Sequence, residues 1–381
     1  MINTVIMIRL TLICLFFLTS LLTIFKAPAY YLWLLAIVVA EFPLIFAGIV
    51  LILLLAGFWV QKHQLWGTII GIAALLLYLS PIARAGIVAK PLKHELSFAF
   101  GSVSNKQPFS FFKLFSTYKN TVPPRILTYA TYSDTTLTLD YYASQIPGKR
   151  PCVIVVHGGS WSSGDSGQVP ELNGYLAKAG YNVAVINYRL APKYQNPAPV
   201  EDVKGALAYL HHHSGELNID TNNFVLLGRS AGAQIALLAA YTLHNKSIKG
   251  VIDLYGPADM VWGYSVPANP LVMDSRGVME QYLGGTYQQV PQNYAASSPI
   301  EFVNKQSIPT LIIHGRNDVL VAYEHSRRLN QKLQQNGIKH YWLQLPWATH
   351  GFDYNLNGPG GQLSTYAIES FLKAVMKYST K

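Results

Sequence analysis

A serine stands between two glycines in the stretch Phe224-Val225-Leu226-Leu227-Gly228-Arg229-Ser230-Ala231-Gly232. The four apolar residues predict a short buried strand, and the alanine-rich stretch 231–240 predicts a helix directly after it. A serine on so tight a strand–turn–helix connection is typical of a G-x-S-x-G nucleophile elbow, whose strain lifts the hydroxyl clear of the sheet. Side chains in place of the glycines would collide with the strand and the helix. Ser230 is therefore the candidate nucleophile.

Two later strands are each followed by a candidate partner of this serine. The apolar run 308–315 leads into Asp318, and the run 341–346 leads into His350. The order Ser, Asp, His is the one that an elbow of this type requires, and parallel strands gather functional groups at their carboxyl ends. His350 is expected to take the serine proton as general base, and Asp318 to hold the imidazole tautomer. The alternatives are a surface aspartate in a turn and a structural histidine.

A glycine-rich turn, His157-Gly158-Gly159-Ser160-Trp161, follows the apolar run 151–156. Backbone with few side chains can turn its N–H groups toward an acyl oxygen. The N–H groups of Gly159 and Ser160, with that of Ala231, are the candidate oxyanion hole, in which one donor contributes roughly 100- to 1,000-fold in rate. The alternative is a plain glycine turn beside a buried histidine. His157 itself is expected to organise this turn.

From about Arg125 to the C-terminus, the chain resembles an α/β-hydrolase of the esterase/lipase group, and it is most similar to hormone-sensitive-lipase-like and feruloyl-esterase-like carboxylesterases. The resemblance implies a triad of Ser230, Asp318 and His350 and backbone oxyanion donors at Gly159, Ser160 and Ala231. It depends on the three motifs above and on the stretches Asn187–Pro192, Pro199–Asp202, His314–Asp318 and His350–Phe352. Two departures leave the substrate open. Ser160 stands where a third glycine is usual, and Arg229 precedes the nucleophile where the lipase-like branch often has aspartate.

The pattern of the remaining chain predicts the same fold class, α/β, with a mostly parallel eight-stranded sheet and helices on both faces. Strands are expected at 126–133, 136–144, 151–157, 182–188, 223–228, 248–255, 308–314 and 340–346, and helices at 168–180, 200–213, 231–244, 322–336 and 362–378. Residues 257–305 hold one short predicted helix, 278–283, and are expected to form a lid or a surface insertion. The candidates for lining an apolar pocket are Trp161, Trp262, Tyr264, Tyr282 and Trp347.

The first quarter of the chain has the composition of membrane helices. Apolar runs at 10–25 (extended by 2–8), 29–60 and 65–83 predict about three spans, since a bilayer core takes about 20 apolar residues of helix. The middle run is too long for one straight span, so a tilt, a kink at Pro43 or a re-entrant break is expected. Ala27-Pro28-Ala29 also fits a signal-peptide cleavage site, which is the competing interpretation of the first run. Glu41 is either functional or a protonated or hydrated carboxyl near a helix break.

The predicted organisation is therefore a transmembrane region at 1–89, a basic and aromatic linker at 90–124 and a catalytic domain at 125–381. Residues 1–125 contain ten Lys or Arg and two Glu, which leaves about +2 of the net charge of +10 for the catalytic domain. Basic and aromatic residues are interleaved in the linker and at its end: Lys90, Lys93, Phe98, Phe100, Lys106, Phe109, Phe111, Phe112, Lys113, Phe115, Lys119 and Arg125. Such a segment suits an anionic lipid surface, and a solvated linker is the alternative.

The sequence thus predicts a multi-pass membrane protein, and the positive-inside rule favours a cytoplasmic catalytic domain by a small margin of charges. The predicted activity is that of a serine hydrolase that cleaves a small-molecule or lipid ester through an acyl-enzyme. A lipase, amidase, peptidase or acyltransferase would use the same residues, and a non-catalytic hydrolase-fold binding protein is the alternative from another class. No cofactor, metal or nucleic-acid partner is indicated, and no protein partner can be assigned.

Overall fold

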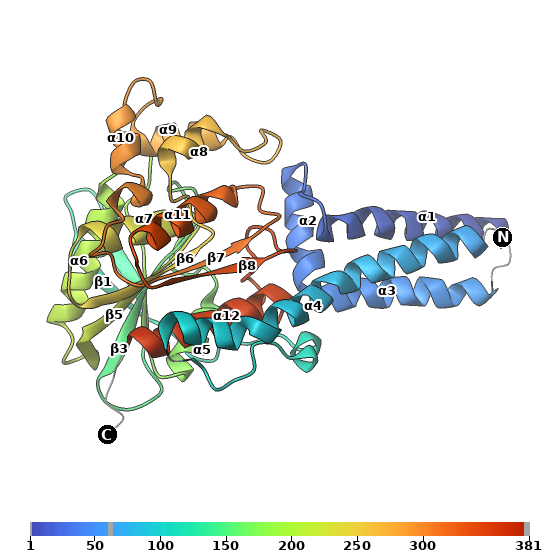
Figure 1. Cartoon of the computed structure of the whole chain (residues 1–381), viewed down its shortest axis with the longest axis horizontal. Helices are drawn as coiled ribbons and strands as arrows, with labels where there is room; N and C mark the ends of the chain where they lie inside the picture. Colours follow the sequence, from blue (N-terminus) through green and yellow to red (C-terminus); the bar gives the residue numbers. More distant parts are fainter. Residues whose placement is uncertain (1, 60–63, 102, 377–381) are drawn as a thin grey trace.

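The computed structural model describes residues 2–59, 64–101 and 103–376, and its centre is one eight-stranded sheet with the order β1-β2-β4-β3-β5-β6-β7-β8 (Figure 1). The strands are β1 Arg125–Thr131, β2 Thr136–Tyr142, β3 Arg150–Val156, β4 Asn182–Ile186, β5 Ile219–Arg229, β6 Ile248–Leu254, β7 Thr310–Gly315 and β8 His340–Leu345. β1 and β2 form the expected antiparallel hairpin, β2 pairs antiparallel with β4, and all other neighbours are parallel. The predicted α/β-hydrolase sheet is confirmed.

Helices cover both faces of this sheet, because alternate residues of the central strands are apolar toward each side. In β3, Ile154 packs into one core and Val153 and Val155 into the other. The helices of the body are α5 Pro170–Lys178, α6 Ala198–His212, α7 Ala231–Thr242, α8 Met260–Ser265, α9 Ser275–Leu283, α10 Pro291–Ala296, α11 Glu324–Gln335 and α12 Pro359–Val375, with a 3₁₀ turn, η4, at Pro299–Phe302. The first core contains α6 and α7, and the second contains α5 and α12.

The N-terminal quarter forms a helical extension from this body. Its helices are α1 Ile2–Ser20, α2 Tyr30–Glu41, α3 Pro43–Leu55 and α4 Gln64–Phe100, with 3₁₀ turns η1 at Leu21–Thr23 and η2 at Ala56–Trp59. In Figure 1, α1, α3 and the first half of α4 run together away from the sheet, and α2 lies across their base against the body. Tyr78 of α4 ties the bundle together, since its hydroxyl lies 2.6 Å from that of Thr19 in α1.

The break expected near Pro43 is present: α2 and α3 meet at an angle of 86°. Proline has no N–H to donate and fits the first turn of a helix, so α3 begins at this residue. Among the described residues, one helix is long and apolar enough to cross a membrane, Leu65–Phe100, and the bent α2–α3 pair gives a second if it counts as one span. This is fewer than the three spans predicted. In the charge distribution expected for three spans, Arg9 and Lys62 share the face opposite to Lys26 and the region after Arg84, and Lys62 lies outside the described residues.

The helix α4 continues well beyond the expected end of the third apolar run. It passes Pro81 and Pro91 and ends at Phe100, inside the segment expected to be a linker. Its second half packs on the body: Leu92 and Leu96 are fully buried in the core that contains α12. These contacts flank Pro91 and support the helix there. The expected linker also contains a 3₁₀ turn, η3 at Phe111–Phe115, and the carbonyl of Ser116, directly after it, accepts a hydrogen bond from Asn357 of the body at 3.0 Å.

Glu41 has a partner that its sequence neighbours do not reveal. Its carboxylate accepts hydrogen bonds from the backbone N–H of Gly360 at 2.9 Å and of Gly361 at 3.4 Å, in the first turn of α12. A Cβ at Gly358 or Gly360 would lie within 2.8 Å of this carboxylate, so only glycine leaves room for it. The first N–H groups of a helix have no intrahelical acceptor, and the carboxyl oxygens of Glu41 supply one for α12. Glu41 therefore fastens α2 to the hydrolase body.

Candidate active site

Ser230 occupies the strained turn that its sequence predicts. Its backbone has φ 53° and ψ −123°, between the end of β5 and the first residue of α7. A Cβ at Gly228 would lie 2.3 Å from backbone atoms of α7, and one at Gly232 would lie 2.3 Å from the backbone of Val156 and His157. Both distances are far below van der Waals contact, so the collision argument for the two glycines is confirmed. The strain is stored at the serine.

Asp318 and His350 lie together at the carboxyl ends of β7 and β8. The Nδ1 of His350 is 2.7 Å from Oδ2 of Asp318. The other carboxylate oxygen accepts the backbone N–H groups of Leu320 and Val321, each at 2.9 Å. Burial alone would raise the pKa of Asp318. The charge interaction with His350 and hydrogen bonds from His314 and His350 outweigh burial and hold this pKa well below its usual range. The carboxylate is therefore ionised and fixed in orientation.

A second histidine, His314, bonds the same carboxylate oxygen as His350. Its Nε2 lies 3.1 Å from Oδ2 of Asp318 and 3.2 Å from the carbonyl oxygen of Val321. Both neighbours are acceptors, so Nε2 carries the proton, and Nδ1 accepts from the hydroxyl of Ser326 at 2.7 Å. Sequence reasoning quoted His314 only as part of a motif and assigned it no role. Its signal was a histidine four residues before the candidate acid, at the end of the same strand.

The turn with Ser230 and the loop with His350 are joined through two buried contacts. The first contact runs through the end of β6, where the carbonyl of Leu254 accepts a hydrogen bond from the N–H of Ser230. The following residue, Tyr255, packs on His350, with ring centroids 4.3 Å apart. Ser230 and Asp318 also line one cavity. Among the described hydrogen bonds, none joins the Ser230 hydroxyl to His350. Such bonds often form only when substrate is bound.

The second contact is an ion pair between Arg229 and Asp353. Arg229 directly precedes the serine, and its Nε lies 2.6 Å from Oδ2 of Asp353, three residues after His350. The hydroxyl of Tyr255 donates to the other carboxylate oxygen at 2.5 Å. Both charged side chains are almost fully buried, and the two terminal guanidinium nitrogens of Arg229 have no protein partner. The arginine that departs from the lipase-like pattern therefore links the two loops.

The glycine-rich turn after β3 is held in an unusual conformation near Ser230. Gly159 has φ 126° and Ser160 φ 54°, and a Cβ at Gly159 would lie 2.0 Å from the carbonyl oxygen of Ser163. Among the described backbone hydrogen bonds that lie outside helices and strands, none is donated by the N–H of Gly159, Ser160 or Ala231. His157 stacks on Tyr188, with ring centroids 4.3 Å apart, as its expected organising role requires. Three N–H groups are thus left available close to the serine.

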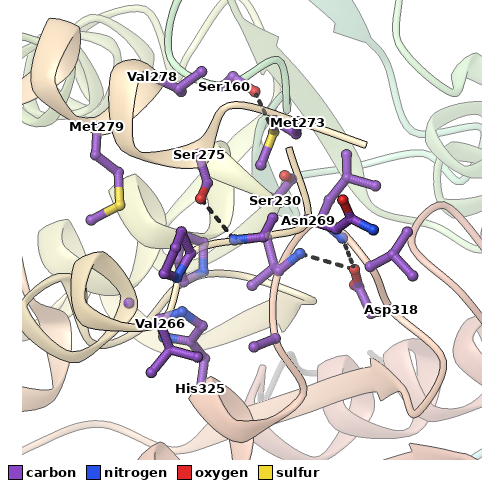
Figure 2. A pocket seen from close by; sticks show the side chains of 18 of the residues that line it. Ser160, Ser230, Val266, Asn269, Met273, Ser275, Val278, Met279, Asp318 and His325 are labelled. Atoms are coloured by element: carbon purple, nitrogen blue, oxygen red, sulfur yellow. Dashed lines mark hydrogen bonds between the residues drawn. The ribbon is translucent and has the colours of Figure 1, made fainter. Parts of the chain in front are cut away.

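The cavity around Ser230 has a volume of about 440 Å³ and is mainly apolar (Figure 2). This volume lies within the usual range for small-molecule sites. Much of its wall comes from the segment expected to be a lid or an insertion, which supplies Pro257, Gly263, Val266, Pro267, Ala268, Asn269, Met273, Ser275, Val278 and Met279. That segment therefore lies over the serine. Of the five aromatic residues expected in the wall, Trp161 is present and the other four are not.

Two ionisable side chains lie in this wall besides Asp318, and both were missed from the sequence. His325, at the start of α11, accepts the N–H of Asp259 on Nδ1 at 3.3 Å. Burial lowers the pKa of His325 to about 3, so the ring is neutral and its proton is on Nε2. No described residue accepts that proton. The other group is Lys26, which lines the cavity together with Ala27 and Pro28 from the connection between α1 and α2.

The donor set does not suggest metal chemistry. In the part of the chain that the structure describes, there is no cluster of three or more His, Cys, Asp or Glu side chains that could bind a metal ion. The two cysteines, Cys14 and Cys152, are free and lie away from Ser230. The polar groups around the cavity are instead arranged as a serine, a histidine–aspartate pair and free backbone N–H groups.

Comparisons with known proteins show which family and which proteins the chain is similar to. The family described as BD-FAE matches residues 139–333. The probable carboxylic ester hydrolase LipM of Mycobacterium tuberculosis is 28% identical over 62% of this chain and 56% of its own length. The esterase LipC of the same organism is 30% identical over 59% of this chain and 58% of its own length. A solved bacterial heroin esterase, 21% identical, superposes with a TM-score of 0.59 over 70% of this chain and 88% of its own. The chain thus spans just over half the length of these curated relatives.

Proposed function

The chain belongs to the BD-FAE family, and from this premise we propose that it is a carboxylic ester hydrolase that works through an acyl-enzyme on Ser230. The names of its relatives, a carboxylic ester hydrolase and an esterase, support the reaction class. The observation that carries the proposal is the strained backbone of Ser230, φ 53°, in the same cavity wall as the buried Asp318 that bonds His350. A strained serine beside a histidine–aspartate pair has no evident structural purpose.

The proposed reaction follows from the protonation states. In the neutral form of His350, the ring proton is on Nδ1, where it donates to the ionised Asp318, so Nε2 has a free lone pair and can act as base. As the oxygen of Ser230 attacks the ester carbonyl, its proton moves to Nε2. The tetrahedral intermediate then expels the alcohol, which takes that proton. Water, activated by the same Nε2, attacks the acyl-enzyme, releases the carboxylic acid and restores the serine.

Stabilisation of the oxyanion is assigned to the N–H groups of Gly159, Ser160 and Ala231. Outside helices and strands these N–H groups donate to no described backbone acceptor. They therefore need not give up a hydrogen bond when the carbonyl oxygen of the ester becomes negative. Ala231 also lies at the start of α7, where the helix dipole favours negative charge. His314 is a positioning residue in this scheme, since it acts on the substrate only through Asp318.

Membrane attachment is the second part of the proposal. The helix Leu65–Phe100 meets the length and composition of a membrane span, and α1 and α3 run along it with many exposed apolar side chains. We place the hydrolase body on the cytoplasmic side, because Lys26 and the basic residues after Arg84 lie at the body end of the bundle. Lipase, amidase, peptidase and acyltransferase activities remain alternatives that use the same residues.

A fluorophosphonate probe, which reacts with activated serines, tests the proposed chemistry. Wild-type protein in detergent or vesicles should be labelled, and Ser230→Ala should not. Hydrolysis of p-nitrophenyl acetate and butyrate should disappear with the same substitution. Absence of labelling in folded wild-type protein would favour the alternative of another class, a non-catalytic binding protein with a hydrolase fold. Flotation of the full chain with phospholipid vesicles tests the membrane attachment separately.

A further inference from the structure

The N-terminal helices contribute directly to the cavity that contains Ser230. Lys26, Ala27 and Pro28, in the connection between α1 and α2, form one of its walls. Ala27 is buried, whereas Lys26 and Pro28 are exposed at the rim. A connection that served only to tie two anchor helices together would not need to enter the wall of a catalytic cavity. Its position makes it a candidate part of the binding site.

Four hydrogen bonds fix the helical extension to the loops of the site. Asn317, next to the candidate acid, donates from Nδ2 to the carbonyl of Ile24 at 3.1 Å. Asn269 donates to the carbonyl of Pro28 at 3.1 Å, and the N–H of Tyr30 donates to Leu271 at 3.0 Å. Further on, the indole N–H of Trp33 in α2 donates to the carbonyl of His350 at 3.1 Å. The base, the acid loop and the cavity wall are therefore all held by this extension.

The same end of the body carries exposed apolar side chains, which we call the junction face: Phe25, Tyr31, Phe112, Phe115, Val266 and Leu271. Two hydrogen bonds from the loop before α12 show that segments of this face lie close together. Asn357 donates to the carbonyl of Ser116, just after η3, and Asn355 donates to the carbonyl of Glu41 in α2. In Figure 1 the bundle leaves the body at this place, beside the loop between α8 and α9. Water is a poor solvent for such a face. The headgroup layer of a bilayer suits its aromatic side chains and the exposed Lys26 and Lys113 beside them in the chain.

From this arrangement we propose that the substrate is a long-chain acyl ester that resides in the bilayer and enters the cavity at the junction face, past the connection 24–29. The inference rests on the proposed esterase activity and membrane attachment and adds the class of substrate. The apolar wall would take the acyl chain, while the headgroup stays at the interface. None of the ion pairs among the described residues involves Lys26, so its ammonium group is free to pair with an anionic headgroup.

The test compares a vesicle-embedded ester with a soluble one. The full chain is reconstituted in phosphatidylcholine vesicles that contain a fluorogenic long-chain acyl ester, and hydrolysis of p-nitrophenyl acetate is measured on the same vesicles. The readout is the ratio of the two rates. Phe25→Asp places a charge on the junction face and should lower this ratio about tenfold or more. Ile126→Asp is the matched control: Ile126 is 73% exposed and Phe25 62%, but Ile126 lies on β1 at the opposite edge of the sheet.

The control should leave the ratio unchanged. Lys26→Glu should lower the rate on an anionic long-chain ester several-fold more than on a zwitterionic one of equal chain length. The inference is overturned if wild-type protein hydrolyses the soluble ester but not the embedded one. It is also overturned if Phe25→Asp and Ile126→Asp change the ratio equally. If the wild-type protein does not hydrolyse p-nitrophenyl acetate, the proposed function is contradicted instead. If the wild-type protein does not float with vesicles, the membrane attachment is contradicted.

Discussion

Asp353→Asn removes the charge that pairs with Arg229 and should destabilise the protein strongly. The pair is buried, with a 2.6 Å contact and side-chain exposures of 2% and 4%. Removing one partner of a buried ion pair costs about 3–5 kcal/mol, because the other charge stays buried without compensation. Arg229 is a severe case, since its two terminal nitrogens already lack protein partners. For a body of this size, 1 kcal/mol shifts the unfolding midpoint by about 2–4 °C, so a fall of roughly 10 °C is expected.

Thermal unfolding of the full chain in detergent measures this shift, with p-nitrophenyl butyrate hydrolysis measured well below the midpoint. Activity should fall as well, since the pair joins the Ser230 turn to the His350 loop. Glu216→Gln is the matched control, because its pair with Arg125 is more than half exposed on both sides and should cost below about 1 kcal/mol. The reasoning is refuted if Asp353→Asn unfolds within about 2 °C of wild type, or if the two substitutions have the same effect.

Three further outcomes are expected. Glu41→Ala removes the acceptor of the first N–H groups of α12 and should lower the unfolding midpoint by a few degrees, from about 1–2 kcal/mol. The Nε2–H of His325 is a free donor in the cavity wall, so we expect the protein to prefer hydroxylated over plain acyl esters of equal length in a p-nitrophenyl series, and His325→Phe should reduce this preference about five- to tenfold. Burial raises the pKa of Asp253 to about 7, so the folded state binds this proton more tightly than the unfolded state. Stability from this group is therefore lost as pH rises from about 4 to 7, and Asp253→Asn should flatten that slope in melting curves.

The parts of the fold that local pattern determines could be predicted from the sequence. All eight strands lie where alternating or continuous apolar runs predicted them, and the two glycines of the Ser230 turn are required for the reason given. The break at Pro43 was likewise predictable, because proline cannot continue α2. These features depend on residues that are neighbours in the chain.

The parts that depend on distant residues could not be predicted. Arg229 was recognised as unusual, but its partner Asp353 is 124 residues away, and Glu41 bonds Gly360 at a separation of 319. The number of membrane helices was overestimated, because apolar composition does not tell whether a run is straight, bent or packed on a body. The helix α4 is an example, since it continues past two prolines and its second half packs on the core that contains α12.

Kinetics of Ser230→Ala, His350→Ala and the double variant test the central claim most directly, that these two residues and Asp318 act as one catalytic unit. The measurement is kcat/KM for p-nitrophenyl butyrate, with thermal unfolding to confirm that each variant is folded. Residues that act as a unit are strongly non-additive. The double variant should therefore lose no more activity than either single variant. Losses that multiply in the double variant, or a His350→Ala protein with near wild-type activity, would contradict the account.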